Sequence, residues 1–227
     1  GELLPGSSEQ VGVWWASSGW KIGRDCPLPQ ARGEALTIRA AKNEVEAAQL
    51  VLRPKAAIQG LSVTPGALNG PAGATIPAAC VEVLEVRYVN VTQTTDRSSV
   101  AGYWPDPLPP IDKPMNLEAG KNQPFWVRVH VPRDARAGVY EGRIDLAAKG
   151  FKTAVPIKIE VYDFDLPNRM TCVTAFGFSD DLAYHYQGVT DPQQKRQVLE
   201  KYFANYSAHH ISTYNLAPLD PIRVTWP

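Results

Sequence analysis

Two adjacent carboxylates, Asp180-Asp181, are the residues whose type and spacing best suit acid–base chemistry in this sequence. Neighbouring acids can hold separated pKa values, so that one donates a proton while the other accepts one. The alternative is that the pair lies in a solvated loop or opens a helix, which is the commoner place for charged side chains. We therefore expect Asp180 and Asp181 to contact a substrate at most, and not to catalyse a reaction.

An aromatic ring beside a carboxylate, Trp104 and Asp106, is a second candidate site. Both lie in a long segment between strands expected to end near Val91 and to start near Phe125, and long loops often carry function. An indole face suits the CH groups of a sugar, while a carboxylate accepts hydrogen bonds from its hydroxyls. The alternative, which we favour, is that this loop packs against the following domain.

Histidines and further tryptophans are weaker candidates. His209 and His210 follow an expected amphipathic helix, where an imidazolium favours the helix dipole, although His210 could instead face the mouth of a barrel. Neither has a partner at metal-ligand spacing, so we expect no metal and no cofactor. Trp14, Trp15 and Trp20 lie near the first strand and are expected in the core.

The elements that must position these residues begin as strands. Apolar and polar residues alternate over residues 125–131, 140–146 and 151–161, and runs at 35–40, 46–53, 58–63 and 81–91 fit the same plan. A slip of the apolar phase between Val83 and Leu84 suggests a bulge. With 17 Gly and 20 Pro in the chain, this pattern predicts a mainly β protein, an antiparallel β-sandwich over residues 1–166. The expected inward-facing residues are Phe125, Val127, Val129, Ile144, Leu146, Val155, Ile157 and Ile159.

A different pattern follows a linker at residues 163–168. Residues 171–178 read as a buried strand, Asp191-Pro192 as a helix start with an apolar stripe behind it, and residues 211–214 as another strand. The stripe consists of Val198, Leu199, Tyr202, Phe203 and Tyr206. Strand, helix and strand form a βαβ unit of about 60 residues, whereas a (β/α)8 barrel takes roughly 250. We expect residues 167–227 to be the first βαβ portion of a truncated α/β barrel.

The amino-acid composition limits the classes of partner that we expect for this protein. The 227 residues include 23 Lys and Arg against 23 Asp and Glu, so charge gives no reason to expect nucleic acid. No apolar run approaches the ~20 residues that span a bilayer, so we expect no membrane span. Cys26, Cys80 and Cys172 allow one disulfide or three buried free thiols, and they do not fix the redox compartment.

Several segments, taken in order, resemble bacterial proteins related to glycoside hydrolase family 123. They are residues 13–29 (Val13-Trp14-Trp15 to Pro29), 41–50 (AKNEVEAAQL), 102–108 (GYWPDPL), 131–142 and 209–221. The resemblance implies a β-sandwich that leads into a (β/α)8 barrel removing N-acetylhexosamine, typically β-linked N-acetylgalactosamine. It also implies a substrate-assisted mechanism, in which the substrate's acetamide is the nucleophile.

The family's catalytic pair is a consecutive Asp-Glu further along the barrel, and this sequence contains no Asp-Glu dipeptide. We therefore expect no catalytic residue in this chain and no activity from it alone. The expected partners are a glycan substrate and the remainder of the barrel. The expected location is periplasmic or extracellular, with a signal peptide already removed. The alternatives are a carbohydrate-binding sandwich module and a structural support for the barrel.

Overall fold

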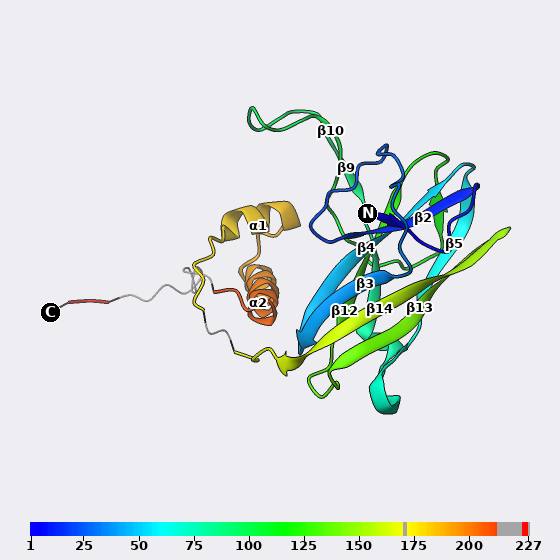
Figure 1. Ribbon diagram of the computed structural model, residues 1–227. Coiled ribbons are helices and arrows are strands. Elements are labelled where there is room, and N and C mark those ends of the chain that lie inside the picture. The colour runs from blue at the N-terminus through cyan, green and yellow to red at the C-terminus, as the bar shows by residue number, and fades with distance from the viewer. Residues whose placement is uncertain (170–171, 213–223, 227) are drawn as a thin grey trace. The chain divides into compact units, whose positions relative to one another are not determined.

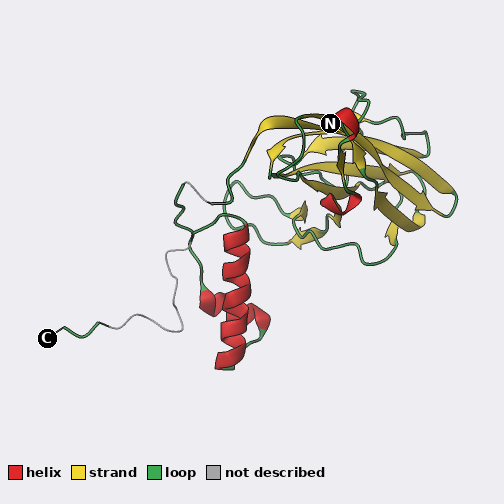
Figure 2. Ribbon diagram, turned by 90° about the horizontal axis from the view of Figure 1, so that it is seen from below, coloured by secondary structure: helices red, strands yellow, loops and turns green. Residues whose placement is uncertain are grey.

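The computed structural model describes residues 1–169, 172–212 and 224–226, and the chain divides into two compact units, Gly1–Leu166 and Pro167–Pro227. Within the described residues, every strand belongs to the first unit and both α-helices belong to the second (Figures 1 and 2). Across these same ranges, no helix combines the length and the apolarity needed to cross a bilayer.

Two large sheets and a two-stranded ribbon form the first unit. One has five strands, all antiparallel, in the order β1 (Glu2–Leu3), β2 (Val11–Ser17), β4 (Val45–Pro54), β12 (Gln123–His130) and β8 (Val81–Glu85). The other has seven, with the main order β11 (Met115–Leu117), β5 (Ile58–Pro65), β13 (Gly138–Ala148), β14 (Phe151–Asp165) and β3 (Leu36–Lys42). Its remaining strands are β6 (Leu68–Asn69), which pairs with β13, and β7 (Thr75–Ile76). Short 3-10 helices lie at Pro71–Gly73 and Ala78–Cys80.

The core lies between the two sheets and confirms the alternation read from the sequence. All eight residues expected inside are at most 1% exposed and belong to one cluster. Leu50 and Leu52 of β4 lie in the same cluster, as do Leu36 and Ile38 of β3. Because the side-chain period of a strand is two, this common face also explains why the residues between them point outwards.

The sandwich is not purely antiparallel, and that prediction was wrong. Strand β3 pairs with β14 in parallel, with Ile157 opposite Leu36 and Val161 opposite Ala40. These strands are more than 100 positions apart, so no hairpin fixes their relative direction. An ion pair lies beside the end of this ladder, between Lys42 and Asp163 at 2.7 Å. The second sheet is therefore mixed.

Two local predictions in the first unit also need correction. The expected strand 81–91 carries no bulge: it ends at Glu85, and the chain continues into a separate strand, β9 (Tyr88–Val91). Trp14 is buried and Trp15 is partly buried on β2, but Trp20 is 68% exposed. Trp20 lies beyond the end of β2, where its carbonyl accepts a 2.6 Å hydrogen bond from Gln49 while the indole points away from the core.

The second unit contains two helices, α1 (Asp180–Gln187) and α2 (Pro192–Ala208). Asp191 caps α2 as predicted, since its carboxylate accepts a 3.0 Å hydrogen bond from the Gln194 N–H. The apolar stripe of α2 packs around one ring, that of Phe178. Its centroid lies 5.1, 6.0 and 5.8 Å from those of Tyr202, Phe203 and Tyr206.

The buried strand expected at 171–178 is not formed over its described part, residues 172–178. Within these residues only Phe176 is in a β-bridge, as a single residue and not as part of a strand. Its N–H donates to the Ser212 carbonyl at 2.9 Å, and the Ser212 N–H donates to the Thr174 hydroxyl at 2.8 Å. Val173 is 88% exposed. The strand expected at 211–214 lies partly outside the described residues.

Candidate functional site

A two-stranded ribbon carries Trp104 and Asp106 away from both large sheets. Strand β9 pairs antiparallel with β10 (Gly102–Pro105), and together they form a separate two-stranded sheet. Figure 1 shows this ribbon reaching out from the sandwich. The long loop expected at this place is therefore a projecting hairpin, whose tip spans residues 92–101.

One face of the ribbon is open to solvent. Trp104 lies directly opposite Val89, so the two side chains share a face, and they are 38% and 43% exposed. The indole N–H donates to the Val100 carbonyl at 2.7 Å. Val100 belongs to the same hairpin, so the one polar atom of the indole is already hydrogen-bonded there. The ring therefore offers a fixed apolar surface. Asp106 follows two residues later with an exposed side chain, while its backbone N–H donates to Arg87.

The opposite face of the ribbon rests on a loop that precedes β3. The guanidinium carbon of Arg24 lies 5.1 Å from the ring centroid of Tyr103 and 5.8 Å from that of Tyr88. The Tyr88 hydroxyl donates to the Ile22 carbonyl at 2.9 Å. Burial raises the pKa of Tyr88 above its usual value, which keeps this hydroxyl protonated as a donor.

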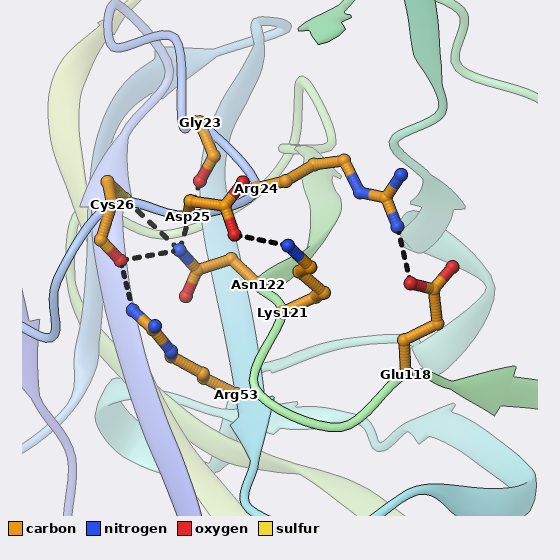
Figure 3. A network of polar contacts seen from close by, with 8 residues as sticks. All are labelled: Gly23, Arg24, Asp25, Cys26, Arg53, Glu118, Lys121 and Asn122. Carbon is orange, nitrogen blue, oxygen red and sulfur yellow. Dashed lines mark hydrogen bonds and ion pairs between the residues drawn. The ribbon is translucent and has the colours of Figure 1, made fainter.

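That loop, residues 22–26, is held by a network that Figure 3 shows in close view. The buried amide of Asn122 donates to the carbonyls of Gly23 and Cys26, at 3.0 and 2.8 Å, and Arg53 donates to the same Cys26 carbonyl. Two ion pairs add to these bonds, Arg24 with Glu118 at 2.7 Å and Lys121 with Asp25 at 2.5 Å. The loop is thus tied to β4 and to the turn before β12, and its backbone has little freedom.

The network also shifts two pKa values. The hydrogen bond from Lys121 lowers the pKa of Asp25, which keeps that exposed carboxyl ionised. Burial raises the pKa of the Cys26 thiol, which favours the unreactive protonated form. Cys26 is free, as are Cys80 and the exposed Cys172, so the three thiols are neither all buried nor bridged.

The other three predicted residues lie in the second unit. Asp180 and Asp181 occupy the first turn of α1 behind the cap Ser179, where a carboxylate interacts favourably with the positive end of the helix. His210 is exposed and follows α2 with a positive φ of 55°. No hydrogen bond or ion pair joins these three residues to one another within residues 172–212. The five predicted residues are therefore divided between two units.

Metal ligation finds no support in the part of the chain that the structure describes, where no three His, Cys, Asp or Glu side chains converge. A hollow of about 530 Å³ lies elsewhere, over β3, β13 and β14. It is lined by Glu2, Glu34 and Glu141 together with Lys158. No residue proposed from the sequence lies in it. The Glu2 carboxylate already accepts a 3.0 Å hydrogen bond from the Trp15 indole, and Lys158 lies among the carboxylates. The ribbon and its supporting loop, which carry Trp104 and Asp106, remain the candidate site.

Sequence reasoning missed the supporting residues of the ribbon. Arg24 lies in the segment 20–29 that served only as a marker of resemblance, and its partner Glu118 is 94 positions away. No periodic pattern reveals such a contact. The one available signal was the unbroken cluster of Gly23, Arg24 and Asp25 between two expected strands, which is typical of a structured loop.

Comparisons with known proteins identify a family and a solved structure with a similar fold. The model of the glycoside hydrolase 123 N-terminal domain matches residues 15–148. A family 123 glycoside hydrolase from Clostridium perfringens, studied for its hydrolysis of glycolipid glycans, superposes with a TM-score of 0.72 at 14% identity. The match covers 89% of this chain and 36% of the relative, so the chain spans about a third of that protein.

Other solved structures are less similar. Spo0M, a sporulation control protein from Bacillus subtilis, gives a TM-score of 0.35 at 10% identity, covering 71% of this chain and 51% of its own. A β-glucosidase from Listeria innocua gives 0.29 at 10% identity, covering 69% and 16%. Scores this low carry no argument about fold or function. No curated protein matches the sequence.

Proposed function

The chain belongs to the glycoside hydrolase 123 N-terminal domain family, and we propose from this premise that it is the front part of a glycoside hydrolase acting on N-acetylhexosamine-containing glycans. The observation that carries the proposal is the family match over residues 15–148, which the sandwich fold supports. In the proposed whole enzyme, the sandwich precedes a (β/α)8 barrel of which residues 167–227 form the beginning. The 89% coverage by the Clostridium enzyme supports this, because the first unit alone is 166 of the 227 residues.

Catalysis in this proposal belongs to residues outside the chain. A substrate-assisted mechanism needs an acid to protonate the glycosidic oxygen and a carboxylate to orient the acetamide. Asp180 and Asp181 do not match the consecutive Asp-Glu pair of the family, and both lie in the first turn of α1. The proposed acid and orienting carboxylate therefore come from later barrel strands, and the mechanism retains the anomeric configuration.

An assay with a chromogenic β-N-acetylgalactosaminide tests this division. We expect the 227-residue chain to show only the uncatalysed rate, and a longer protein that includes the complete barrel to release the chromophore. Turnover by the chain that disappears in Asp181→Asn would place catalysis in α1 and contradict the proposal. A complete protein that leaves N-acetylhexosaminides intact but cleaves another glycoside would contradict the substrate class.

A direct glycan contact by the sandwich unit is the second candidate function, and the geometry of Trp104 favours it. The indole is fixed by its bond to Val100, and the Asp106 carboxylate is exposed close by. A ring that is already fixed loses little conformational entropy on binding. Binding of N-acetylgalactosamine oligosaccharides on a glycan array, lost in Trp104→Ala and kept in Trp20→Ala, would support this contact. If the wild-type chain binds no glycan, the sandwich supports the barrel and does not bind substrate.

A further inference from the structure

We propose that Arg24 is a positioning residue, whose guanidinium holds the β9–β10 ribbon in the one orientation that presents Trp104 to the glycan. The inference rests on the proposed glycan contact of Trp104 and Asp106. Arg24 does not touch the sugar in this proposal. It acts on the far face of the ribbon, through Tyr88 and Tyr103.

The two faces of the ribbon differ in their contacts, because only one of them meets the Arg24 guanidinium. A two-stranded ribbon is marginally stable by itself, since it has no third strand or second sheet to pack against. Its open face carries Trp104 and Val89, which have about two-fifths of their surface in solvent. The other face carries Tyr88, which is partly buried, and Tyr103, which is 53% exposed. Both rings lie within 6 Å of the Arg24 guanidinium carbon, so Arg24 is placed to hold this face of the ribbon and with it the orientation of Trp104.

Arg24 can serve as a support because it is itself held. Glu118 pairs with its guanidinium at 2.7 Å, and the N–H of Asn122 donates to its backbone carbonyl at 2.8 Å. The Arg24 side chain is only 23% exposed although it carries a full charge. An arginine that only solubilised the surface would extend into water. This one is enclosed by two rings and a carboxylate.

The geometry requires a planar cation. A guanidinium can face an aromatic ring and use its N–H groups in the plane to reach a carboxylate, so it serves Tyr103 and Glu118 together. A lysine ammonium carries the same charge but is compact and strongly hydrated, so it engages one of these partners at a time. Arg24→Lys should therefore keep part of the support that the cation gives to the ribbon, and Arg24→Ala should lose all of it.

The first measurement is the order of the ribbon backbone, from ¹⁵N relaxation on the 227-residue chain. In the wild type we expect order parameters of about 0.85 for residues 88–91 and 102–105, falling below about 0.6 in Arg24→Ala. Arg24→Lys should lie between. The matched control is Arg39→Ala, because Arg39 is also ion-paired, with Glu160 at 3.0 Å, but on the seven-stranded sheet. It should leave the ribbon unchanged. A ribbon equally ordered in Arg24→Ala would overturn the proposal.

The second measurement is the binding of methyl N-acetyl-β-galactosaminide, followed by the Trp104 indole resonance. If loss of Arg24 leaves about a third of the ribbon population correctly oriented, the dissociation constant rises about threefold. Arg39→Ala should bind like the wild type. Equal binding by the wild type and Arg24→Ala would overturn the role of Arg24 while the glycan contact stands. No binding by the wild type would refute the glycan contact itself, and with it the role of Arg24 toward the sugar, even if the ribbon loosens.

Discussion

The sandwich unit and the second unit use their apolar residues differently. In the sandwich, side chains from both sheets meet in a single cluster, and residues such as Phe125 and Leu50 are completely buried. In the described part of the second unit, three hydrophobic residues are buried, Ala183, Tyr184 and Leu199. Tyr186 is 81% exposed there. The first unit has a continuous core, whereas the described residues of the second unit leave apolar side chains exposed.

The reason lies in the kind of element each unit contains. Two sheets cover one another's inner faces, whereas in the described part of the second unit α2 packs against the rings of Phe178 and Phe176. Each Å² of apolar surface left in water forgoes roughly 25 cal/mol of stabilisation. We therefore expect the sandwich to be the stable unit and the second unit to open more readily. Each of the following measurements tests whether the two units differ in stability.

The largest expected effect is on the sandwich core. Phe125→Ala removes a ring that is 0% exposed and should lower the free energy of unfolding by about 3–5 kcal/mol. Urea denaturation followed by near-UV circular dichroism measures it. The matched variant is Phe176→Ala in the second unit, where the ring is 52% exposed, and it should change this transition by less than about 0.5 kcal/mol. Equal losses from the two variants would mean that the units do not differ.

Hydrogen exchange compares the units without mutation. In dilute monomeric protein, amides of residues 125–131 should exchange only when the sandwich opens, while those of α2 should exchange through local opening. We expect protection factors about a hundredfold lower in α2, which corresponds to ~2.7 kcal/mol. Equal protection would show that residues 167–227 form a complete fold, and it would remove the argument for a truncated barrel.

The sandwich was predictable to the extent that burial leaves a local pattern. Val127 and Val129 alternate with outward-facing residues because one face of β12 is dry, and that pattern is visible in a single strand. The partner of β3 was not predictable, because a choice between parallel and antiparallel neighbours depends on a strand more than 100 positions away. The parallel pair was missed for this reason.

The candidate site shows the same limit. The sequence places Trp104 close to Asp106, since they are two positions apart. It gave no indication that Arg24 and Asn122 hold the ribbon and its loop, because those contacts join segments about 80 to 100 residues apart. The apolar run at 171–178 was misread for a physical reason. Apolarity alone favours burial, but Val173 in this run is 88% exposed and only Phe176 of its described residues is in a β-bridge.

A smaller effect is expected at Tyr140, which is 0% exposed in the sandwich core. Its hydroxyl accepts from the Arg136 N–H at 3.1 Å and donates to the Arg136 carbonyl at 3.0 Å. Tyr140→Phe keeps the ring but loses both bonds, so unfolding should become easier by about 1–2 kcal/mol. Tyr162→Phe is the control, because its ring lies 39% exposed at the surface, and it should be neutral. An unchanged urea midpoint in Tyr140→Phe would show that water replaces the lost bonds.

The smallest expected effect is at the cap of α2. Asp191→Ala removes the carboxylate that accepts the Gln194 N–H, which should cost the helix about 1 kcal/mol and raise amide exchange in its first turns about fivefold. Asp191→Asn retains an acceptor oxygen and should keep most of this stability. Because the cap belongs to the second unit, neither variant should change the urea transition of the sandwich. A loss of about 1 kcal/mol in that transition would show that the two units unfold as one. The contrast in core burial would then describe how each unit is packed, but not how the chain unfolds.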